Sequence, residues 1–445
     1  MTSATTTKEF FGHPRGLFVL FFTEMWERFS YYGMRAILVL YLVSQTDAAN
    51  AGLGWANDSA LALYGWYTML VYVASIPGGW LADKFFGQKK SVLYGGILLV
   101  LGHSVLAIEE MWAFYSGLSL IIAGVGMLKP NISTMVGGLY KPGDIRRDKG
   151  FTIFYIGINL GAFLSSLIVG YVGEVMGWHY GFGLAGIGMT LGLIQYVLGQ
   201  KYLKDVGNYI GASKDEEEIA ALNRPLTKIE KDRVVVLFLS FFLVIVFWGA
   251  FEQAGGLMNI YAMENTNRML FGLEVPASWF QSLNAMFIIF LGTAVAAYWA
   301  KRKLRGKLST SLFKMIIGLI IMGTGFFFMS AASTEFETTG SSAMYWLVLA
   351  YLFHTVGELC ISPVALSYIT KLAPLKYASL MMGVYFAMTG FGNKLAGLLG
   401  ESASTYGEFT IFTGIALFCI TFGLIVLLIR KKLEVLTHGI EDTEH

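Results

Sequence analysis

The chain has 445 residues, of which 55% are hydrophobic and 14% are charged, and its mean hydropathy is +0.60. A soluble domain carries about 25% charged residues, and a single soluble core stops growing near about 250–300 residues. These values exclude one soluble unit and indicate an integral membrane protein. The net charge of +2 is too small to indicate nucleic-acid binding. Cys360 and Cys419 both lie in apolar segments, so neither a disulfide scaffold nor a metal site is expected.

The apolar segments are long enough to cross a bilayer, and we expect helices because lipid cannot satisfy free backbone groups. The 52 glycines suit close helix packing, while only 8 prolines and no alternating pattern disfavour a membrane β-barrel. The first fifteen residues are polar, so no removable signal peptide is expected. In chain order, the sequence predicts twelve spans at residues 16–43, 58–81, 91–108, 111–139, 151–175, 178–200, 234–262, 276–300, 308–332, 341–370, 377–400 and 408–430.

The distribution of Lys and Arg between these spans predicts the orientation of the chain. Alternate segments, beginning with the N-terminus, contain 26 of these residues, whereas the intervening loops contain one, Arg268. By the positive-inside rule both termini are cytoplasmic. The longest interruption, 201–233, carries an acidic run and is expected to be a cytoplasmic linker. We therefore predict two six-helix bundles, 1–200 and 234–445, the second ending in a short cytoplasmic tail, with substrate bound between the bundles.

The first predicted span is unusual because it places charged residues within the hydrocarbon. Helical spacing puts three of its four charges on one face, together with Tyr31 or Tyr32. A buried charge costs several kcal/mol unless it is paired or hydrated, so this face is expected to contact protein or a water-filled cavity. The four charged residues are Glu24, Glu27, Arg28 and Arg35.

Three further charges, Lys129, Glu252 and Glu358, lie deep in predicted spans 4, 7 and 10. In a six-plus-six repeat, span 1 corresponds to span 7 and span 4 to span 10. We therefore predict ion pairs between the bundles, Arg35 with Glu252 and Lys129 with Glu358. Fixed structural ion pairs are the alternative; in the favoured interpretation, protonation or an incoming ligand breaks the pairs. The deep acids outnumber the bases by one, and burial allows the surplus acid to hold a proton.

A small zwitterion would suit this set of side chains. Arg35 can bind a carboxylate with two parallel hydrogen bonds, Lys129 adds a point charge, and Glu358 can accept an ammonium group. Two amides in predicted spans 5 and 8, Asn159 and Asn284, offer further donors and acceptors. Aromatic side chains that could form amphipathic walls are Tyr31, Tyr32, Tyr72, Trp248 and Tyr385. The residues alone therefore predict an ion- or proton-coupled carrier of a small zwitterionic or anionic solute.

Motifs along the chain support a more specific interpretation. The string EMWERFSYYG at 24–33 resembles the first-helix motif of the proton-dependent oligopeptide transporter family, a branch of the major facilitator superfamily. The resemblance covers both predicted bundles. Other segments similar to that family are GWLAD at 79–83, KPN at 129–131, FY at 154–155 with NLG at 159–161, FEQ at 251–253, QSLN at 281–284, GEL at 357–359 with SP at 362–363, and TKL at 370–372.

The resemblance implies uptake of di- and tripeptides, driven by an inward proton gradient through alternating access. It assigns Arg35 and Lys129 to the peptide carboxylate, and it assigns Asn159, Asn284 and Glu358 to the amino end. The proton is then the coupling ion, and we expect no other cofactor, no catalytic residue and no metal. The residues that the resemblance assigns to proton coupling are Glu24, Glu27, Arg28 and Glu252.

Three departures from the family pattern are visible. The segment 201–233 is too short and charged for the two extra helices that bacterial members often carry. Tyr385 stands where many members have tryptophan, which bears on peptide preference. Gly65 stands where animal members have a histidine, so no proton role is transferred there. His354, one helical turn before Glu358, is interpreted as a packed side chain rather than as a group that tunes that acid.

Two other classes of function are the alternatives to peptide transport. A relative on the same scaffold could carry an amino acid, nitrate or a drug-like molecule. A membrane enzyme or receptor is disfavoured because no metal-ligand cluster and no nucleophile–base set appears, and a nucleotide-binding loop is also missing. We therefore expect a monomeric transporter in the lipid bilayer of a cell membrane, the inner membrane of a bacterium, with peptides and protons as its partners.

Overall fold

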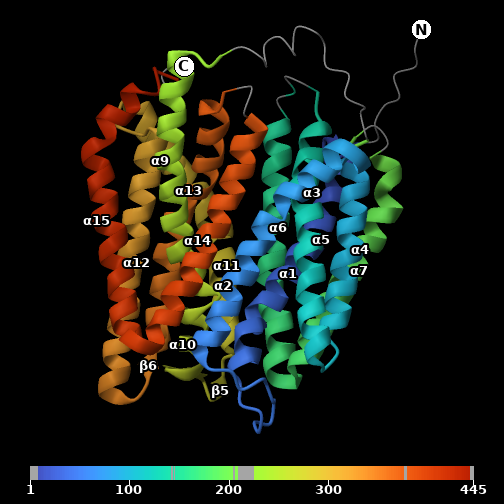
Figure 1. Ribbon diagram of the computed structural model, residues 1–445, viewed down its shortest axis with the longest axis vertical. Coiled ribbons are helices and arrows are strands. Elements are labelled where there is room, and N and C mark those ends of the chain that lie inside the picture. The colour runs from blue at the N-terminus through green and yellow to red at the C-terminus, as the bar shows by residue number, and fades with distance from the viewer. Residues whose placement is uncertain are drawn as a thin grey trace. The chain divides into compact units, whose positions relative to one another are not determined.

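Helices form nearly all of the regular structure, as expected for apolar segments that must satisfy their own backbone groups. The computed structural model describes residues 9–141, 144, 146–203, 206–208, 225–374 and 378–440 (Figure 1). Within these residues, strands are limited to two-residue pieces. The strands are β1 Glu9–Phe10, β2 His13–Pro14, β3 Thr266–Asn267, β4 Met269–Leu270, β5 Leu273–Glu274 and β6 Ser342–Ala343.

The helices divide between two compact units. The first unit comprises Met1–Leu53 and Leu70–Ala212, and the second comprises Gly54–Met69 and Ser213–His445. The helix α2, Asn57–Val73, therefore contributes residues to both units. The predicted bundle boundaries, 1–200 and 234–445, stay a prediction, and residues 209–224 of the predicted linker lie outside the described part of the chain.

The first unit is built from helices that pack in two groups. In one group α1 packs against α6 and α7, and in the other α5 packs against α3 and α4. Glycine allows α4 and α5 to approach closely, because a Cβ on Gly95 would lie 2.7 Å from the carbonyl oxygen of Gly124. The helices of this unit are α1 Arg15–Val43, α3 Ser75–Leu81, η1 Ala82–Phe86, α4 Gly87–Leu106, α5 Met111–Gly138, α6 Arg147–Tyr171, η2 Val172–Met176, α7 Trp178–Gly199 and η3 Gln200–Tyr202.

The second unit follows the same packing principle. The helix α12 packs against α13 and α15, while α14 packs against α9 and α11 packs against α13. A Cβ on Gly318 of α12 would lie 2.7 Å from the carbonyl oxygen of Gly357 of α13. The helices of this unit are α9 Lys228–Phe251, η4 Glu252–Ala254, α10 Leu257–Glu264, η5 Ala277–Gln281, α11 Ser282–Leu304, α12 Ser311–Thr339, α13 Met344–Leu372, α14 Ala378–Tyr406 and α15 Glu408–Val435.

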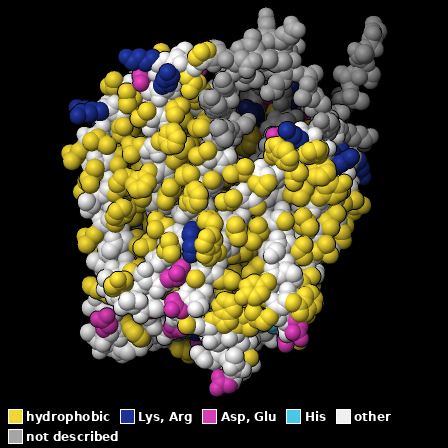
Figure 2. Space-filling view, viewed as in Figure 1, with side chains coloured by type: hydrophobic (Ala, Val, Ile, Leu, Met, Phe, Trp, Pro, Cys, Tyr) yellow, Lys and Arg dark blue, Asp and Glu magenta, His cyan; other side chains and the backbone are white. Residues whose placement is uncertain are grey.

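The predicted membrane character is confirmed, but the count of twelve spans stays a prediction. Within the described residues, nine helical stretches are long and apolar enough to cross a bilayer. One of them, Asn57–Leu106, covers two predicted spans. Two further helices, α1 and α14, are each 29 residues long but contain several charged side chains. Figure 2 shows hydrophobic side chains over most of the described face, as expected for a surface that contacts lipid.

The structure also changes two details of the predicted spans. The predicted span 234–262 is not one continuous helix, because α9 ends at Phe251 and a 3-10 turn begins at Glu252. The interruption places Glu252 at a break in the helix. Pro130 and Pro363 both lie inside helices, in α5 and α13. A proline inside a helix removes one backbone hydrogen bond, so the helices are expected to bend at these two positions.

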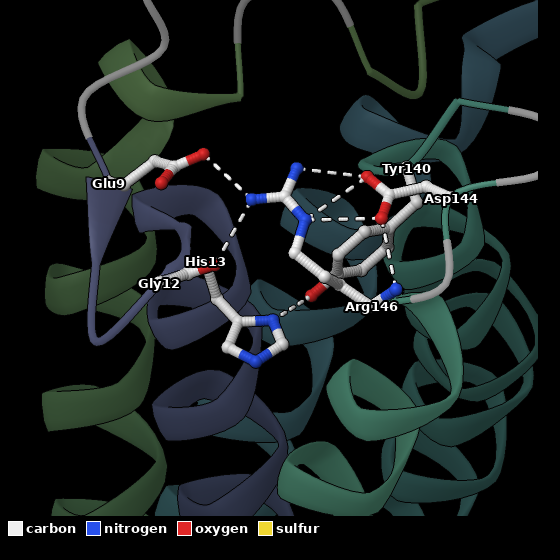
Figure 3. A network of polar contacts seen from close by, with 6 residues as sticks. All are labelled: Glu9, Gly12, His13, Tyr140, Asp144 and Arg146. Carbon is white, nitrogen blue, oxygen red and sulfur yellow. Dashed lines mark hydrogen bonds and ion pairs between the residues drawn. The ribbon is translucent and has the colours of Figure 1, made fainter.

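A short hairpin, β1–β2, joins the N-terminal segment to the loop between α5 and α6 (Figure 3). Arg146 connects the two, since its Nη1 donates to Glu9 Oε1 at 2.8 Å and its Nη2 donates to Asp144 Oδ2 at 2.9 Å. His13 Nδ1 lies 2.8 Å from the Tyr140 hydroxyl, and both residues are buried. Burial raises the pKa of Tyr140 to about 12, so its phenol stays protonated at physiological pH.

Candidate transport site

The charged residues of α1 form a tightly paired group. Arg28 donates from Nε to Glu24 Oε1 at 2.8 Å and from Nη2 to the same oxygen at 2.6 Å. Its Nε also lies 3.2 Å from Glu27 Oε2. All three residues are buried. The burial expected for this face is therefore present, and a guanidinium offsets the cost of placing two carboxylates inside the protein.

Tyr32 places the two arginines of α1 next to the same aromatic ring. The Arg35 Cζ lies 4.7 Å from the centroid of the Tyr32 ring, and the Arg28 Cζ lies 5.7 Å from it. The rings of Tyr31 and Tyr32 meet edge to face, with centroids 5.4 Å apart. A cation over an aromatic face is attracted by the quadrupole of the ring. Of the predicted tyrosines, Tyr32 therefore contacts Arg35, the predicted carboxylate-binding arginine, and Tyr31 packs on Tyr32.

Lys129 brings α5 into the same group of charges. Its Nζ lies 3.7 Å from the centroid of the Tyr72 ring, near the end of α2 that belongs to the first unit. Lys129 and Arg28 both interact electrostatically with the Glu27 carboxylate. Arg28, Arg35 and Lys129 therefore lie near the two acids of α1, Glu24 and Glu27.

Asn159 of α6 has a more local role than the sequence predicts. Its side chain is buried, and its Nδ2 donates to the carbonyl oxygen of Tyr155 at 2.9 Å, one turn earlier in the same helix. In this arrangement, the amide donor serves the backbone of α6. A direct contact with a peptide amino end stays a prediction for this residue.

In the second unit, the structure brings together Glu358 and Asn284, two of the residues that the resemblance assigns to the amino end of a peptide. The Asn284 Nδ2 donates to Glu358 Oε2 at 2.7 Å and to Thr355 Oγ1 at 3.1 Å. Thr355 is fully buried on the same helix as Glu358, and its hydroxyl donates to the carbonyl oxygen of Tyr351 at 2.7 Å. Sequence reasoning missed Thr355. Its spacing of three residues from Glu358 was the available signal.

Glu252 has a hydrogen-bond partner that the sequence analysis did not name. The Tyr64 hydroxyl of α2 donates to Glu252 Oε2 at 3.0 Å, and both side chains are almost fully buried. The hydroxyl lies against the backbone of η4, since a Cβ on Gly255 would be 2.0 Å from it. Tyr64 adjoins Gly65, the position compared with the animal histidine. That adjacency was the signal that could have identified it.

The predicted aromatic walls of the second unit also meet. Trp248 lies one turn before Glu252 and packs edge to face on Phe251, with ring centroids 5.2 Å apart. Tyr385 of α14 is buried and lies next to both Trp248 and Glu358. Trp248, Tyr385 and Glu358 therefore belong to one neighbourhood.

The structure separates the remaining charged and titratable side chains from this neighbourhood. His354 is buried against Phe326, with ring centroids 4.3 Å apart, and neither ring nitrogen has a hydrogen-bond partner among the described residues. The interpretation of His354 as a packed side chain is confirmed. Lys394 pairs with Glu401 at 3.2 Å and lies over the Trp66 ring at 4.9 Å. Its charge is thus partly balanced within the second unit.

Two groups of predictions about the site stay predictions. The predicted ion pairs, Arg35 with Glu252 and Lys129 with Glu358, each join residues from the two compact units. The roles in proton coupling and peptide binding are likewise expectations drawn from the resemblance. Within the described residues there is no cluster of three or more His, Cys, Asp or Glu side chains that could hold a metal ion.

Comparison with known proteins identifies the family. The sequence pattern of the POT family matches residues 89–216 and 212–410 of this chain. The chain belongs to the POT family. The resemblance found in the sequence motifs is therefore confirmed, and the chain is a membrane transporter with multiple apolar helices.

Full-length relatives support this assignment. The chain is 38% identical to an uncharacterized transporter, YclF, of Bacillus subtilis (strain 168), over 97% of each chain. It is 36% identical to a di-/tripeptide transporter of Lactococcus lactis subsp. cremoris, over 96% of this chain and 97% of the relative. The crystal structure of a peptide transporter POT in complex with sulfate is similar with a TM-score of 0.89, at 37% identity over 97% of each chain.

Proposed function

We propose that this POT-family protein imports di- and tripeptides together with protons, by alternating access across a cell membrane. The observation that carries the proposal is the separation of charge between the two units. The first unit offers Arg35 and Lys129 beside tyrosine rings, and the second offers Glu358 held by Asn284. A peptide has a carboxylate at one end and an ammonium at the other, so its two ends match these two groups.

The hydrogen bonds within each unit support the division of roles. Arg35 can form two parallel hydrogen bonds with the peptide carboxylate, and Lys129 adds a charge without fixed geometry. Glu358 accepts from Asn284 at Oε2, and a carboxylate can accept several hydrogen bonds, including those of an ammonium group. The aromatic side chains, Tyr31, Tyr32, Tyr72, Trp248 and Tyr385, provide apolar surfaces for peptide side chains.

Proton coupling is assigned to the acids that burial makes costly to ionise. A proton on Glu252 removes its charge, so an ion pair with Arg35 is weakened and the carboxylate of a peptide can take the place of the acid. Arg28 keeps Glu24 and Glu27 paired at 2.6 and 3.2 Å, so these acids respond to protonation as a group. We extend the proposal to twelve spans, cytoplasmic termini, a monomer and a bacterial inner membrane.

Uptake into liposomes tests the proposal. Purified protein should accumulate labelled dialanine when the outside is acidic, and excess unlabelled tripeptide should compete. A protonophore should abolish the accumulation, because it removes the gradient without touching the protein. Alanine and nitrate supplied alone test the alternative solutes. If a panel of di- and tripeptides shows no gradient-driven accumulation while one of those solutes does, the peptide assignment is wrong.

Glu252→Gln separates coupling from binding. The substitution removes a titratable group while keeping an oxygen that can accept from Tyr64. Gradient-driven uptake should be lost, and exchange of internal for external peptide should continue. Glu274→Gln is the matched control, since Glu274 pairs with Arg268 and its side chain is 64% exposed. Full gradient-driven uptake by Glu252→Gln would refute the coupling role of this acid.

A further inference from the structure

A group of cations surrounds two aromatic rings at one end of α11, α12 and α15, the end predicted to be cytoplasmic. Arg302 and Arg430 share the Phe313 ring, because the Cζ of each lies 5.5 Å from the ring centroid. The Trp299 ring lies next to the Phe313 ring, with centroids 6.1 Å apart. The Nζ of Lys314 lies 5.8 Å from the Trp299 ring. Three cations from three helices therefore converge on one small region of the second unit.

The negative charge described at this place is smaller than the positive charge. Glu434 lies 3.5 Å from the Arg430 Nε, and it also accepts a hydrogen bond of 2.5 Å from the Thr310 hydroxyl. Arg302 donates from Nε to the neutral carbonyl oxygen of Leu308 at 2.7 Å. Of the two guanidinium groups, Arg430 is therefore paired with a carboxylate that is shared with a hydroxyl, and Arg302 donates to a neutral oxygen. The surplus of positive charge favours an additional anion.

Arg430 supplies the donors for such an anion. Its side chain is only 11% exposed, although a guanidinium normally keeps its five N–H groups in water or on acceptors. Its Nε and Nη1 are buried and have no hydrogen-bond partner among the described residues. Buried unsatisfied donors are costly, and a phosphate can accept two parallel hydrogen bonds from one guanidinium. The geometry at Arg430 therefore fits a phosphate oxygen.

The surface beside the cations indicates where the phosphate comes from. Leu304 at the end of α11 is 89% exposed, and Leu428 and Ile425 of α15 are 83% and 51% exposed. Figure 2 shows hydrophobic side chains along the left-hand helices, where Figure 1 places α12 and α15, with Lys and Arg at their upper end. An acyl chain gains favourable free energy from contact with such an apolar surface, whereas a free phosphate ion does not. Anionic lipids also concentrate at the cytoplasmic leaflet.

We propose that Arg302 and Arg430 bind the phosphate of an anionic phospholipid, with Lys314 adding charge and an acyl chain lying along α15. The proposal does not depend on which solute is transported. It assigns a lipid-binding role to residues that the peptide mechanism does not use. Because the aromatic ring of Phe313 holds both guanidinium groups in place, their N–H donors are already positioned when the phosphate binds.

Native mass spectrometry of the full-length protein in detergent tests the proposal with phosphatidylglycerol as the probe. The variant Arg302→Gln/Arg430→Gln should lose about fivefold or more of the bound phosphatidylglycerol, since each basic residue near anionic lipid contributes measurably to binding. The matched control is Arg305→Gln/Lys307→Gln. It removes the same charge from exposed positions of the adjoining loop and should retain binding. Phosphatidylcholine should bind weakly to all three proteins.

Two results would overturn the proposal. Equal retention of phosphatidylglycerol by the two double variants would show that total charge, not this cluster, binds the lipid. Displacement of the lipid by glycerol 3-phosphate at similar concentration would show that the site takes a free phosphate. If the first double variant does not fold, a photoreactive phosphatidylglycerol on the unaltered protein decides the question. Labelling of residues 424–434 is expected, and labelling confined to other helices would contradict the assignment.

Discussion

The buried acids of the two units are stabilised by different kinds of partner. In the first unit, Glu24 and Glu27 lie within 2.6 and 3.2 Å of the Arg28 guanidinium, a full charge on the same helix. In the second unit, the described hydrogen bonds to Glu252 and Glu358 come from neutral groups, a phenol and an amide. A charged partner on the same helix keeps an acid paired in every conformation of the unit. A neutral donor satisfies one oxygen of the acid without neutralising its charge.

This difference bears on how substitutions in the two units should act. Removing one member of a buried ion pair leaves the other charge uncompensated, which is strongly destabilising. Removing a neutral donor costs one or two hydrogen bonds and leaves the fold intact. The first unit should therefore respond to substitution mainly through stability, and the second mainly through transport.

The largest expected effect is that of Arg28→Met. The substitution leaves Glu24 and Glu27 buried without their guanidinium, and breaking a buried pair of this kind costs about 3–5 kcal/mol. Thermal unfolding of the purified protein, monitored by size-exclusion chromatography, should show a strongly lowered midpoint temperature. The triple variant Arg28→Met/Glu24→Gln/Glu27→Gln should recover much of that stability. A midpoint unchanged by Arg28→Met would remove the distinction between the two units.

Asn284→Ala should weaken peptide binding more than it weakens the fold. The substitution removes the 2.7 Å donor to Glu358 together with the bond to Thr355, which is worth about 2–3 kcal/mol where a charged acceptor is involved. The dissociation constant for dialanine, measured by calorimetry, should rise about 30-fold or more. Asn57→Ala is a matched control, because its amide donates to Glu264 at 3.1 Å on the exposed surface. Equal affinities in the two variants would contradict the role of Glu358.

Tyr64→Phe should give a smaller effect that is specific to coupling. The substitution removes a hydroxyl that donates to Glu252 Oε2, a hydrogen bond worth about 1.5 kcal/mol, or about tenfold in rate. Gradient-driven uptake should fall by that factor, while peptide exchange should continue. Tyr196→Phe is the control, since its hydroxyl donates to the Lys89 carbonyl oxygen at 2.8 Å. If driven uptake and exchange fall equally, Tyr64 has only a structural role.

The smallest expected effect concerns the exposed ion pairs of the N-terminal hairpin. Hydrogen bonds from Arg146 hold the pKa of Asp144 below its usual range. A lowered pKa contributes stability above the unfolded value, about 3.9, and the contribution disappears as pH falls through the lower folded value. The hairpin should therefore stay docked between pH 7 and pH 5, the range of an uptake experiment.

Hydrogen exchange of residues 9–14 measures that docking. Protection, corrected for intrinsic rates, should be the same at pH 7 and pH 5 in the unaltered protein. Arg146→Gln should lower the protection at both pH values, because the substitution removes the contacts to Glu9 and Asp144. Arg147→Gln is the control, as Arg147 lies over the Phe151 ring instead. Protection that is lost in the unaltered protein at pH 5 would contradict the assignment to Asp144.

Much of this organisation could be predicted from the sequence, for identifiable reasons. Hydrophobic length predicts helices, and the low charge content makes each deep charge conspicuous. The family resemblance assigned Asn284 and Glu358 to one end of the peptide, but their hydrogen bond to each other was not predicted. The contact between Tyr64 and Glu252 was not predicted. It depends on the rotation of α2 and on the break in the helix after α9, which hydropathy does not encode. The hydrogen bond from Asn159 to the carbonyl oxygen of Tyr155 likewise depends on the side-chain rotamer of Asn159.

The helix α2 has a mechanical consequence, because it belongs to both units. Tyr64, in the part assigned to the second unit, contacts Glu252, and Tyr72, in the part assigned to the first, contacts Lys129. The two tyrosines are eight residues apart on one continuous helix, a rise of about 12 Å. A rotation of α2 about its axis would therefore move both tyrosines together, and with them the surroundings of Glu252 and of Lys129.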